Sequence, residues 1–244
     1  MVLMSESAQD PQSKAIIWST ATADYYSLLT ILFQTPTHEV IQGYTEELII
    51  EDYYEVAQEM GIVEASINEA ADYLRQAQNE LANNQNALSF IRQEYTRLFS
   101  HPASPVIPLY EGVFVDSERV AAGLTSSYAR LFINPAAINA EKFYRQAGFD
   151  CNKQVSVPAD CITTELEYLG QLNQLIAQSI MACDDKQVAA LNELLVSFWK
   201  EHVINWMPRF FERCQEESRI ALYKAAGMMG RILMDEKERR LTWN

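Results

Sequence analysis

The 244-residue sequence has few of the residues that make tight turns, and it has no long apolar run. Eight glycines and eight prolines are too few for the many turns of an all-β chain, so they favour long helices with few connections. No apolar run approaches the roughly 18 to 20 residues that a membrane-spanning helix requires. The four cysteines form no C-x-x-C pair, and the first residues lack a basic region followed by an apolar stretch. We therefore expect reduced thiols, no secretory signal and a cytoplasmic location.

The usual signatures of a catalyst or a metal site are also absent. Of the three histidines, none belongs to H-E-x-x-H, and none follows a glutamate by three residues as in a helical di-iron site. The motifs G-x-G-x-x-G, G-x-x-x-x-G-K and G-x-S-x-G do not occur, which excludes the common phosphate loops and the nucleophile elbow. Gly227 and Gly230 in AAGMMGR indicate close helix packing rather than a nucleotide loop. We expect no enzyme, no metal ion and no bound cofactor.

Negative charge dominates, because 33 acidic residues against 19 basic ones give a net charge of −14. A field of this sign repels phosphate backbones and anionic lipid surfaces, so nucleic acid and membranes are not expected partners. The same field attracts basic peptides, although acidity also keeps a surface soluble without any partner. The apolar share of 48% is typical of a folded globular protein.

Apolar residues recur at helical spacing along most of the chain, which predicts an all-α fold with one large helical domain. We expect helices over residues 11–35, 37–59 with a break near residue 50, 63–83, 88–98, 117–132, 136–147, 160–180, 185–208 and 209–237. A hinge is predicted at residues 149–159, between an N-terminal helical part at 1–148 and a C-terminal helical part at 160–244. The two parts are expected to form one compact unit.

A proline-rich stretch, HPASPVIP, interrupts the predicted helices at residues 101–108. Its three prolines forbid a continuous helix and force a stiff, extended connection. We expect this loop to display the three residues that follow it, Leu109, Tyr110 and Glu111.

Four stretches of the sequence form a constellation when they are taken in order. EYTRLF at 94–99 is similar to an acidic-aromatic-x-x-Leu-Phe helix end, and IPLYE at 107–111 is similar to a Pro-x-Tyr-Glu-Ser loop. DCITTELEYL at 160–169 resembles Asp-His-x-x-x-Glu-Leu-Glu-Phe, and WKEHVINWMP at 199–208 resembles Glu-His-x-x-x-Trp-x-Pro. Over residues 90–215 the chain thus resembles the TorD/DmsD/NarJ family of molybdoenzyme maturation chaperones, and most closely the TorD/DmsD branch. This resemblance implies a TorD/DmsD-like helical bundle.

Two positions depart from the family pattern. Cys161 stands where the family has histidine, so a group that titrates near neutral pH is replaced by a small apolar thiol. Gly112 stands where the family has the serine of its loop motif. Asp160 is retained, and the sequence leaves open whether it caps the helix that it opens or meets a cation.

The resemblance implies a cytoplasmic chaperone that binds the twin-arginine leader peptide, the catalytic subunit, or both, of a molybdopterin oxidoreductase. Such a chaperone assists cofactor insertion and delays export until the enzyme has folded. The resemblance also implies transient contact with molybdopterin guanine dinucleotide or GTP, and it is compatible with a monomer and with a domain-swapped dimer.

A twin-arginine leader has a basic pair followed by an apolar segment, so its receptor needs carboxylates near one end of an apolar groove. We expect the groove to be lined by residues at the helix end and in the loop: Tyr95, Leu98, Phe99, Pro108 and Tyr110. Glu111 and Asp160, with Cys161 beside them, are the expected partners of the arginines, because guanidinium pairs with carboxylates in bidentate geometry.

Other interpretations of the same residues stay open. Leu98 and Phe99 are also compatible with plain core packing, and Glu94 with an ion pair to Arg97 on the same helix face. A helical adaptor that binds an amphipathic helix would be indifferent to arginine substitution in its ligand. An all-helical enzyme with an apolar pocket rests only on the aromatic content of 11%, and a chromophore or metal in the purified protein would reveal it.

Overall fold

The chain is built from helices. The structure, a computed structural model, describes residues 10–126, 134–149 and 158–241, and within these ranges it contains no β-strand, so the all-α prediction is confirmed. None of the helices in these ranges combines the length and the apolar character that crossing a bilayer requires. The helices are α1 (Pro11–Phe33), α2 (His38–Thr45), α3 (Leu48–Glu59), α4 (Glu64–Ala82), α5 (Ala87–Tyr95), the short π-helix η1 (Thr96–Ser100), α6 (Glu111–Ala121), α7 (Pro135–Ala147), α8 (Ile162–Met181), α9 (Asp185–Phe198), the short π-helix η3 (Trp199–Val203), α10 (Ile204–Glu217) and α11 (Ala221–Leu241).

Several helix ends follow from local signals in the sequence. Pro11 occupies the first position of α1, where its missing N–H is not needed. The side chain of Asn134 accepts hydrogen bonds from the first amides of α7, and Gly148 ends that helix with a φ of 68°. Asp184 caps α9 by accepting from the amide of Gln187 at 3.0 Å. The predicted boundaries of α1, α4 and α7 are therefore confirmed to within a few residues.

Other boundaries were predicted wrongly. The break in the second segment lies at residues 46–47 rather than near residue 50, and Glu47 there has a φ of 63°. Helix α6 begins at Glu111 instead of residue 117, so Glu111 opens a helix and does not stand in the extended loop. The end of that predicted helix, residues 127–132, lies outside the described residues.

Pro208 was predicted to end a helix, but it lies inside α10. The π-helix η3 runs directly into α10, and the N–H that Pro208 lacks would have bonded to the carbonyl of Ile204, the first residue of α10. The predicted helix over 209–237 is instead divided into α10 and α11 by residues 218–220.

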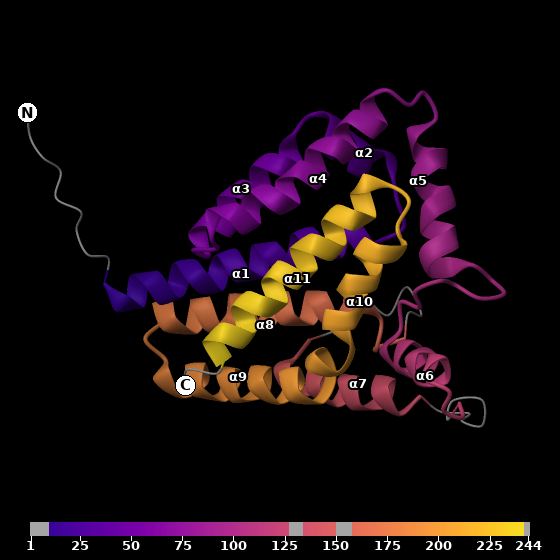
Figure 1. Ribbon diagram of the computed structural model, residues 1–244. Helices are drawn as coiled ribbons and strands as arrows, with labels where there is room; N and C mark the ends of the chain where they lie inside the picture. The colour runs from indigo at the N-terminus through magenta and orange to yellow at the C-terminus, as the bar shows by residue number, and fades with distance from the viewer. Residues whose placement is uncertain (1–9, 127–133, 150–157, 242–244) are drawn as a thin grey trace, which may run out of the picture.

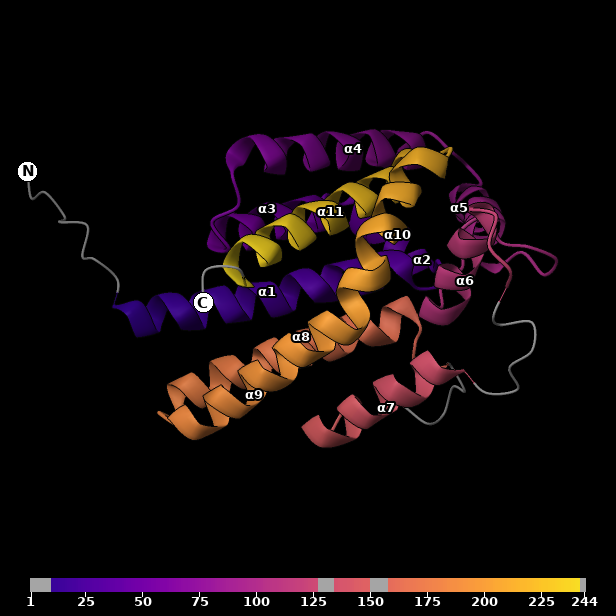
Figure 2. The same cartoon turned by 60° about the horizontal axis from the view of Figure 1, so that its bottom comes forward.

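Helices from distant parts of the sequence pack together (Figures 1 and 2). Helix α1 lies along α8, α8 packs on α9, and α11 packs on α4, α10 and α1. In both views α5 and α6 lie at one end of the molecule. The buried apolar side chains form one cluster that includes residues from α1 to α11. The predicted division at residues 149–159 stays a prediction, because residues 150–157 lie outside the described ranges.

Two glycines of α11 let it approach α10 closely. A Cβ atom at Gly227 would lie 2.6 Å from the backbone oxygen of Phe211, and one at Gly230 would collide with the Phe211 ring. The prediction that this glycine pair serves helix packing is confirmed.

Candidate functional site

An aromatic pocket lies where α5 ends and the proline-rich loop begins. It has a volume of about 570 Å³ and is lined by Tyr95, Phe99, Leu109 and Tyr110, together with Thr35, Arg92, Thr96, Ser100, His101 and Pro105. The rings of Tyr95 and Phe99 are edge to face, with centroids 5.3 Å apart. We call this cavity the Tyr110 pocket.

The backbone of the loop is fixed at both of its ends. The amide of Ile107, late in the loop, donates to the carbonyl of Leu98, just before the loop, at 2.7 Å, which folds the loop back onto η1. Near its end, Tyr110 pairs with Cys161 in an isolated bridge. There the amide of Glu111 donates to the carbonyl of Asp160 at 2.9 Å. Tyr110 is thus held between the end of α5 and the start of α8.

Asp160 caps α6 and does not cap α8, the helix that begins just after it. Its Oδ2 atom accepts from the amide of Gly112 at 3.1 Å and from the side chain of Asn134 at 2.6 Å. Gly112 is in the first turn of α6, so Asp160 supplies an acceptor for that helix across 48 residues of sequence. Helix α8 begins after Cys161 without a side-chain cap.

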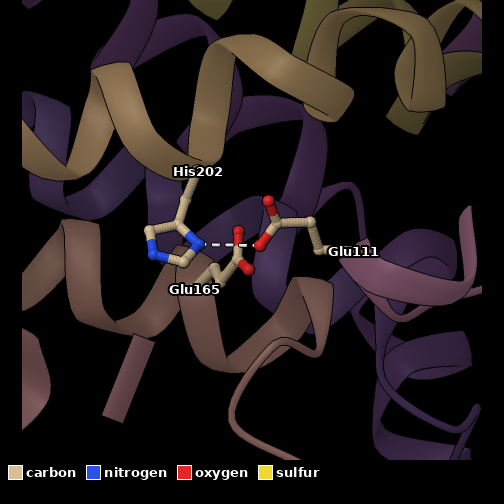
Figure 3. A group of neighbouring side chains, drawn as sticks. All are labelled: Glu111, Glu165 and His202. Carbon is tan, nitrogen blue, oxygen red and sulfur yellow. Dashed lines mark hydrogen bonds and ion pairs between the residues drawn. The ribbon is translucent and has the colours of Figure 1, made fainter. Parts of the chain in front are cut away.

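A second set of polar side chains, from α6, α8 and η3, is buried (Figure 3). Glu111 from α6, Glu165 from α8 and His202 from η3 point toward one another, and His202 Nδ1 lies 2.7 Å from Glu111 Oε2. Trp206 Nε1 donates to Glu165 Oε2 at 3.1 Å. We call Glu111, Asp160, Glu165 and His202 the buried acid cluster, because their exposed fractions are only 6, 0, 0 and 1%.

The hydrogen bonds around His202 indicate which of its ring nitrogens carries a proton. The amide nitrogen of Asn139 lies 2.8 Å from a carboxylate oxygen of Glu201 and 3.2 Å from His202 Nε2. An amide that donates to both groups makes Nε2 an acceptor, so Nδ1 carries the proton that is donated to Glu111.

The pKa of Glu165 is strongly shifted. Burial, and next the charge of Glu111, raise the pKa of Glu165 well above its ordinary value of 4.5. Glu165 therefore keeps its proton to a higher pH than an exposed glutamate does, and its protonated form can donate a hydrogen bond within the cluster.

The cluster also has the composition of a cation site. One ligand atom each from Glu111, Glu165 and His202 lie within 4.8 Å of one another. A hydrogen bond joins Glu111 and His202, whereas Glu165 accepts one from Trp206. None of the three residues lines the Tyr110 pocket or the groove described below. The arrangement ties α6, α8 and η3 together. The predicted absence of a metal ion stays a prediction.

The residues predicted to bind the leader divide into two groups. Tyr95, Phe99 and Tyr110 line the pocket. The others are buried and are not part of the pocket lining: Leu98, Pro108, Glu111, Asp160 and Cys161. Burial raises the pKa of the Cys161 thiol, which therefore stays protonated. Glu94 pairs with Arg97 at 2.7 Å, as the alternative interpretation of that residue predicted.

Sequence reasoning missed Glu165, His202, Trp206 and Asn134 as members of this region. A signal for Glu165 was present, because it lies three residues after Ile162 on the apolar face of α8. His202 and Trp206 lie in the faintest of the four matching stretches.

Glu167 was also missed, and it is an exposed carboxylate on α8. Burial raises its pKa, while the side chain of Gln34 beside it lowers the pKa. Gln34 precedes Thr35, which lines the Tyr110 pocket.

Residues 62–212 match the family described as nitrate reductase delta subunit, a match that covers more than half of the chain and all four stretches. The chain belongs to this family. The resemblance to the TorD/DmsD type of maturation chaperone is therefore confirmed.

Curated relatives of this family member carry the name chaperone protein TorD. A protein of that name from Photobacterium profundum is 25% identical over 161 residues, which cover 66% of this chain and 68% of the relative. Another from Vibrio cholerae serotype O1 is 24% identical over 169 residues, which cover 68% of this chain and 69% of the relative. At the level of the family, the chain is a molybdoenzyme maturation chaperone.

Proposed function

We propose that this protein is a cytoplasmic chaperone that binds the twin-arginine leader, and through it the catalytic subunit, of a molybdopterin oxidoreductase. It would delay export until the cofactor is inserted, and it catalyses no reaction itself. The observation that supports this function best is the Tyr110 pocket, an aromatic cavity at the end of a fixed loop in a family of maturation chaperones.

Tyr95, Phe99 and Tyr110 contact the apolar segment of the leader in this proposal. Their side chains have few rotatable bonds, and Tyr95 and Phe99 are already held by packing against each other, so little side-chain entropy is lost on binding. Because the loop is hydrogen-bonded at both ends, the pocket needs little ordering when the leader arrives.

The predicted roles of Glu111 and Asp160 need a refinement, because both carboxylates are closed from solvent. We propose that they act on the leader indirectly, by holding the start of α6 and the Tyr110 backbone in place. Leu98, Pro108 and Cys161 support the pocket from behind. Glu167 is exposed on α8 and lies beside Gln34, and it is the carboxylate proposed to pair with a leader arginine.

Leader binding can be measured by fluorescence anisotropy with labelled synthetic leaders of the molybdopterin oxidoreductases encoded in the same genome. We expect one leader to bind, and we expect Arg-Arg→Lys-Lys in that peptide to weaken the affinity about tenfold, which corresponds to about 1.4 kcal/mol. Tyr110→Ala should weaken binding by about tenfold or more. Tyr73→Ala is the matched control, because Tyr73 is also half-buried but lies on α4, away from the pocket.

The same titrations separate the competing functions. Equal affinity for the Arg-Arg and Lys-Lys leaders would favour the helical adaptor. An affinity that Tyr110→Ala does not change would contradict leader binding in the Tyr110 pocket. A chromophore or stoichiometric metal in the purified protein would favour an enzyme. Contact with molybdopterin guanine dinucleotide or GTP stays a prediction of the resemblance.

A further inference from the structure

A second, larger cavity lies toward the other end of α8. It has a volume of about 790 Å³ and is formed by α1, α8, α9 and α11. Its apolar lining includes Trp18, Ile176, Ile180, Val188, Leu195 and Trp199. We call it the α11 groove, and its size is within the range of about 300 to 1,000 Å³ that is usual for small-molecule sites.

The charge of this groove is opposite to that of the whole protein. Four basic residues line it, Lys14, Lys237, Arg239 and Arg240, against a single acidic one, Glu236. The Glu236 carboxylate already forms ion pairs with two of these residues, Arg239 at 3.4 Å and Arg240 at 3.0 Å. A basic groove in a chain of net charge −14 would concentrate anions and repel the arginines of a leader peptide.

Lys237 is a buried lysine without a carboxylate partner in the described part of the chain. Only 2% of it is exposed, and its Nζ donates to the neutral amide oxygen of Asn173 at 3.1 Å. The same Nζ lies 4.1 Å from the centroid of the Trp18 ring. Burial, and next the charge of Arg240, lower the pKa of Lys237 well below its ordinary value, which favours the neutral amine. An anion beside Lys237 would favour the protonated form and remove much of the cost of a buried charge.

We propose that the α11 groove binds a small organic anion, with an apolar or aromatic body against Trp18 and Leu195 and its anionic group on Lys237 Nζ. Asn173 uses one of the three donors of that ammonium, so donors remain for the ligand. Lys14, in the exposed first turns of α1, adds a second positive charge at the rim. This site is separate from the Tyr110 pocket and does not depend on leader binding.

The test uses the full chain and two dyes that share an aromatic body. The first, 8-anilinonaphthalene-1-sulfonate, carries an anionic group, and the second, N-phenyl-1-naphthylamine, is its neutral counterpart. We expect saturable fluorescence enhancement with one site for the sulfonate, and at least tenfold weaker binding of the neutral dye. Lys237→Met should weaken sulfonate binding at least tenfold, because it keeps the apolar stem and removes the charge.

Matched variants make the result specific to the groove. Lys224→Met is the same substitution on the same helix outside the groove, and it should leave the affinity unchanged. Tyr110→Ala should also have no effect, which excludes dye bound in the Tyr110 pocket. Lys14→Gln changes only an exposed side chain and should weaken binding about threefold, so it decides the question if Lys237→Met does not fold.

Three outcomes would overturn the proposal. They are equal affinity for the two dyes, no saturable binding of the sulfonate, and sulfonate binding that neither Lys237→Met nor Lys14→Gln weakens. Leader anisotropy with Lys237→Met gives an independent result, because this variant should bind the leader with unchanged affinity.

Discussion

The buried acid cluster and the α11 groove lie toward opposite ends of α8, and they differ in the partners that their buried ionisable groups have. At the start of the helix, Glu165 is enclosed with Glu111 and His202 and accepts a hydrogen bond from Trp206. In its second half, α8 contributes Asn173, the only hydrogen-bond acceptor that the described residues offer to Lys237 Nζ. Lys237 itself lines the α11 groove.

This difference separates a structural role from a binding role. Ionisable groups that are buried against one another, such as Glu111 and His202, stabilise one arrangement of helices. A charged group that is buried at the wall of a cavity, without a partner of opposite sign, leaves an interaction that a ligand can complete.

The largest expected effect comes from breaking the cluster. His202→Ala would leave the Glu111 carboxylate buried without its hydrogen-bond donor, and it should lower the free energy of unfolding by about 3 to 5 kcal/mol. Urea denaturation measures this change, with the exposed His38→Ala as control. A loss below about 1 kcal/mol would mean that the cluster contributes little to the fold.

The pH dependence of stability sharpens the comparison at Glu165. Its pKa is raised in the folded state, so its contribution to the free energy of unfolding is full below about pH 4.5 and is lost as the pH rises toward the folded pKa. Glu165→Gln keeps an oxygen for Trp206 but does not titrate. In that window the free energy of unfolding of the variant should rise relative to that of the wild type by up to about 1.4 kcal/mol per pH unit. Urea denaturation at several pH values measures this difference.

The contribution of Lys237 to the free energy of unfolding should change with pH in the opposite direction. Its pKa is lowered in the folded state, so its contribution is full above about pH 10.5 and is lost as the pH falls toward the folded pKa. Relative to the wild type, Lys237→Met should therefore lose stability as the pH rises through that window, again by up to about 1.4 kcal/mol per unit. Parallel curves for the two proteins would contradict the burial of an unpaired ammonium.

An exposed ion pair supplies the baseline for these effects. Asp72 lies 2.8 Å from Arg75 on α4, and its side chain is 76% exposed. Asp72→Ala should change the free energy of unfolding by less than about 0.5 kcal/mol, because water and salt already screen the pair. A larger effect in urea denaturation would mean that surface charge, and not burial, dominates the electrostatics of this protein.

Local signals predicted much of the fold, and they failed where distant residues decide the outcome. Pro11, Asn134 and Gly148 mark helix ends by themselves, and the structure agrees with them. The start of α6 depends instead on Asp160, which accepts from Gly112 across 48 residues of sequence. No spacing within the segment from 101 to 120 encodes that contact.

The candidate site was predictable to a similar extent. Tyr95, Phe99 and Tyr110 were expected together, because a helix end and a short proline-rich loop keep them close. The burial of Glu111 and Asp160 was not foreseen, since it requires α6, α8 and η3 to meet. Lys237 and Asn173 are 64 residues apart, so their pairing is visible only in the folded chain.

Hydrogen–deuterium exchange with and without a bound leader peptide tests the central claim most directly. If the leader occupies the Tyr110 pocket, amides over residues 95–111 and at the start of α8 should exchange more slowly, while those over 236–241 should not change. Slower exchange around the α11 groove instead, or no change at residues 95–111, would contradict the account.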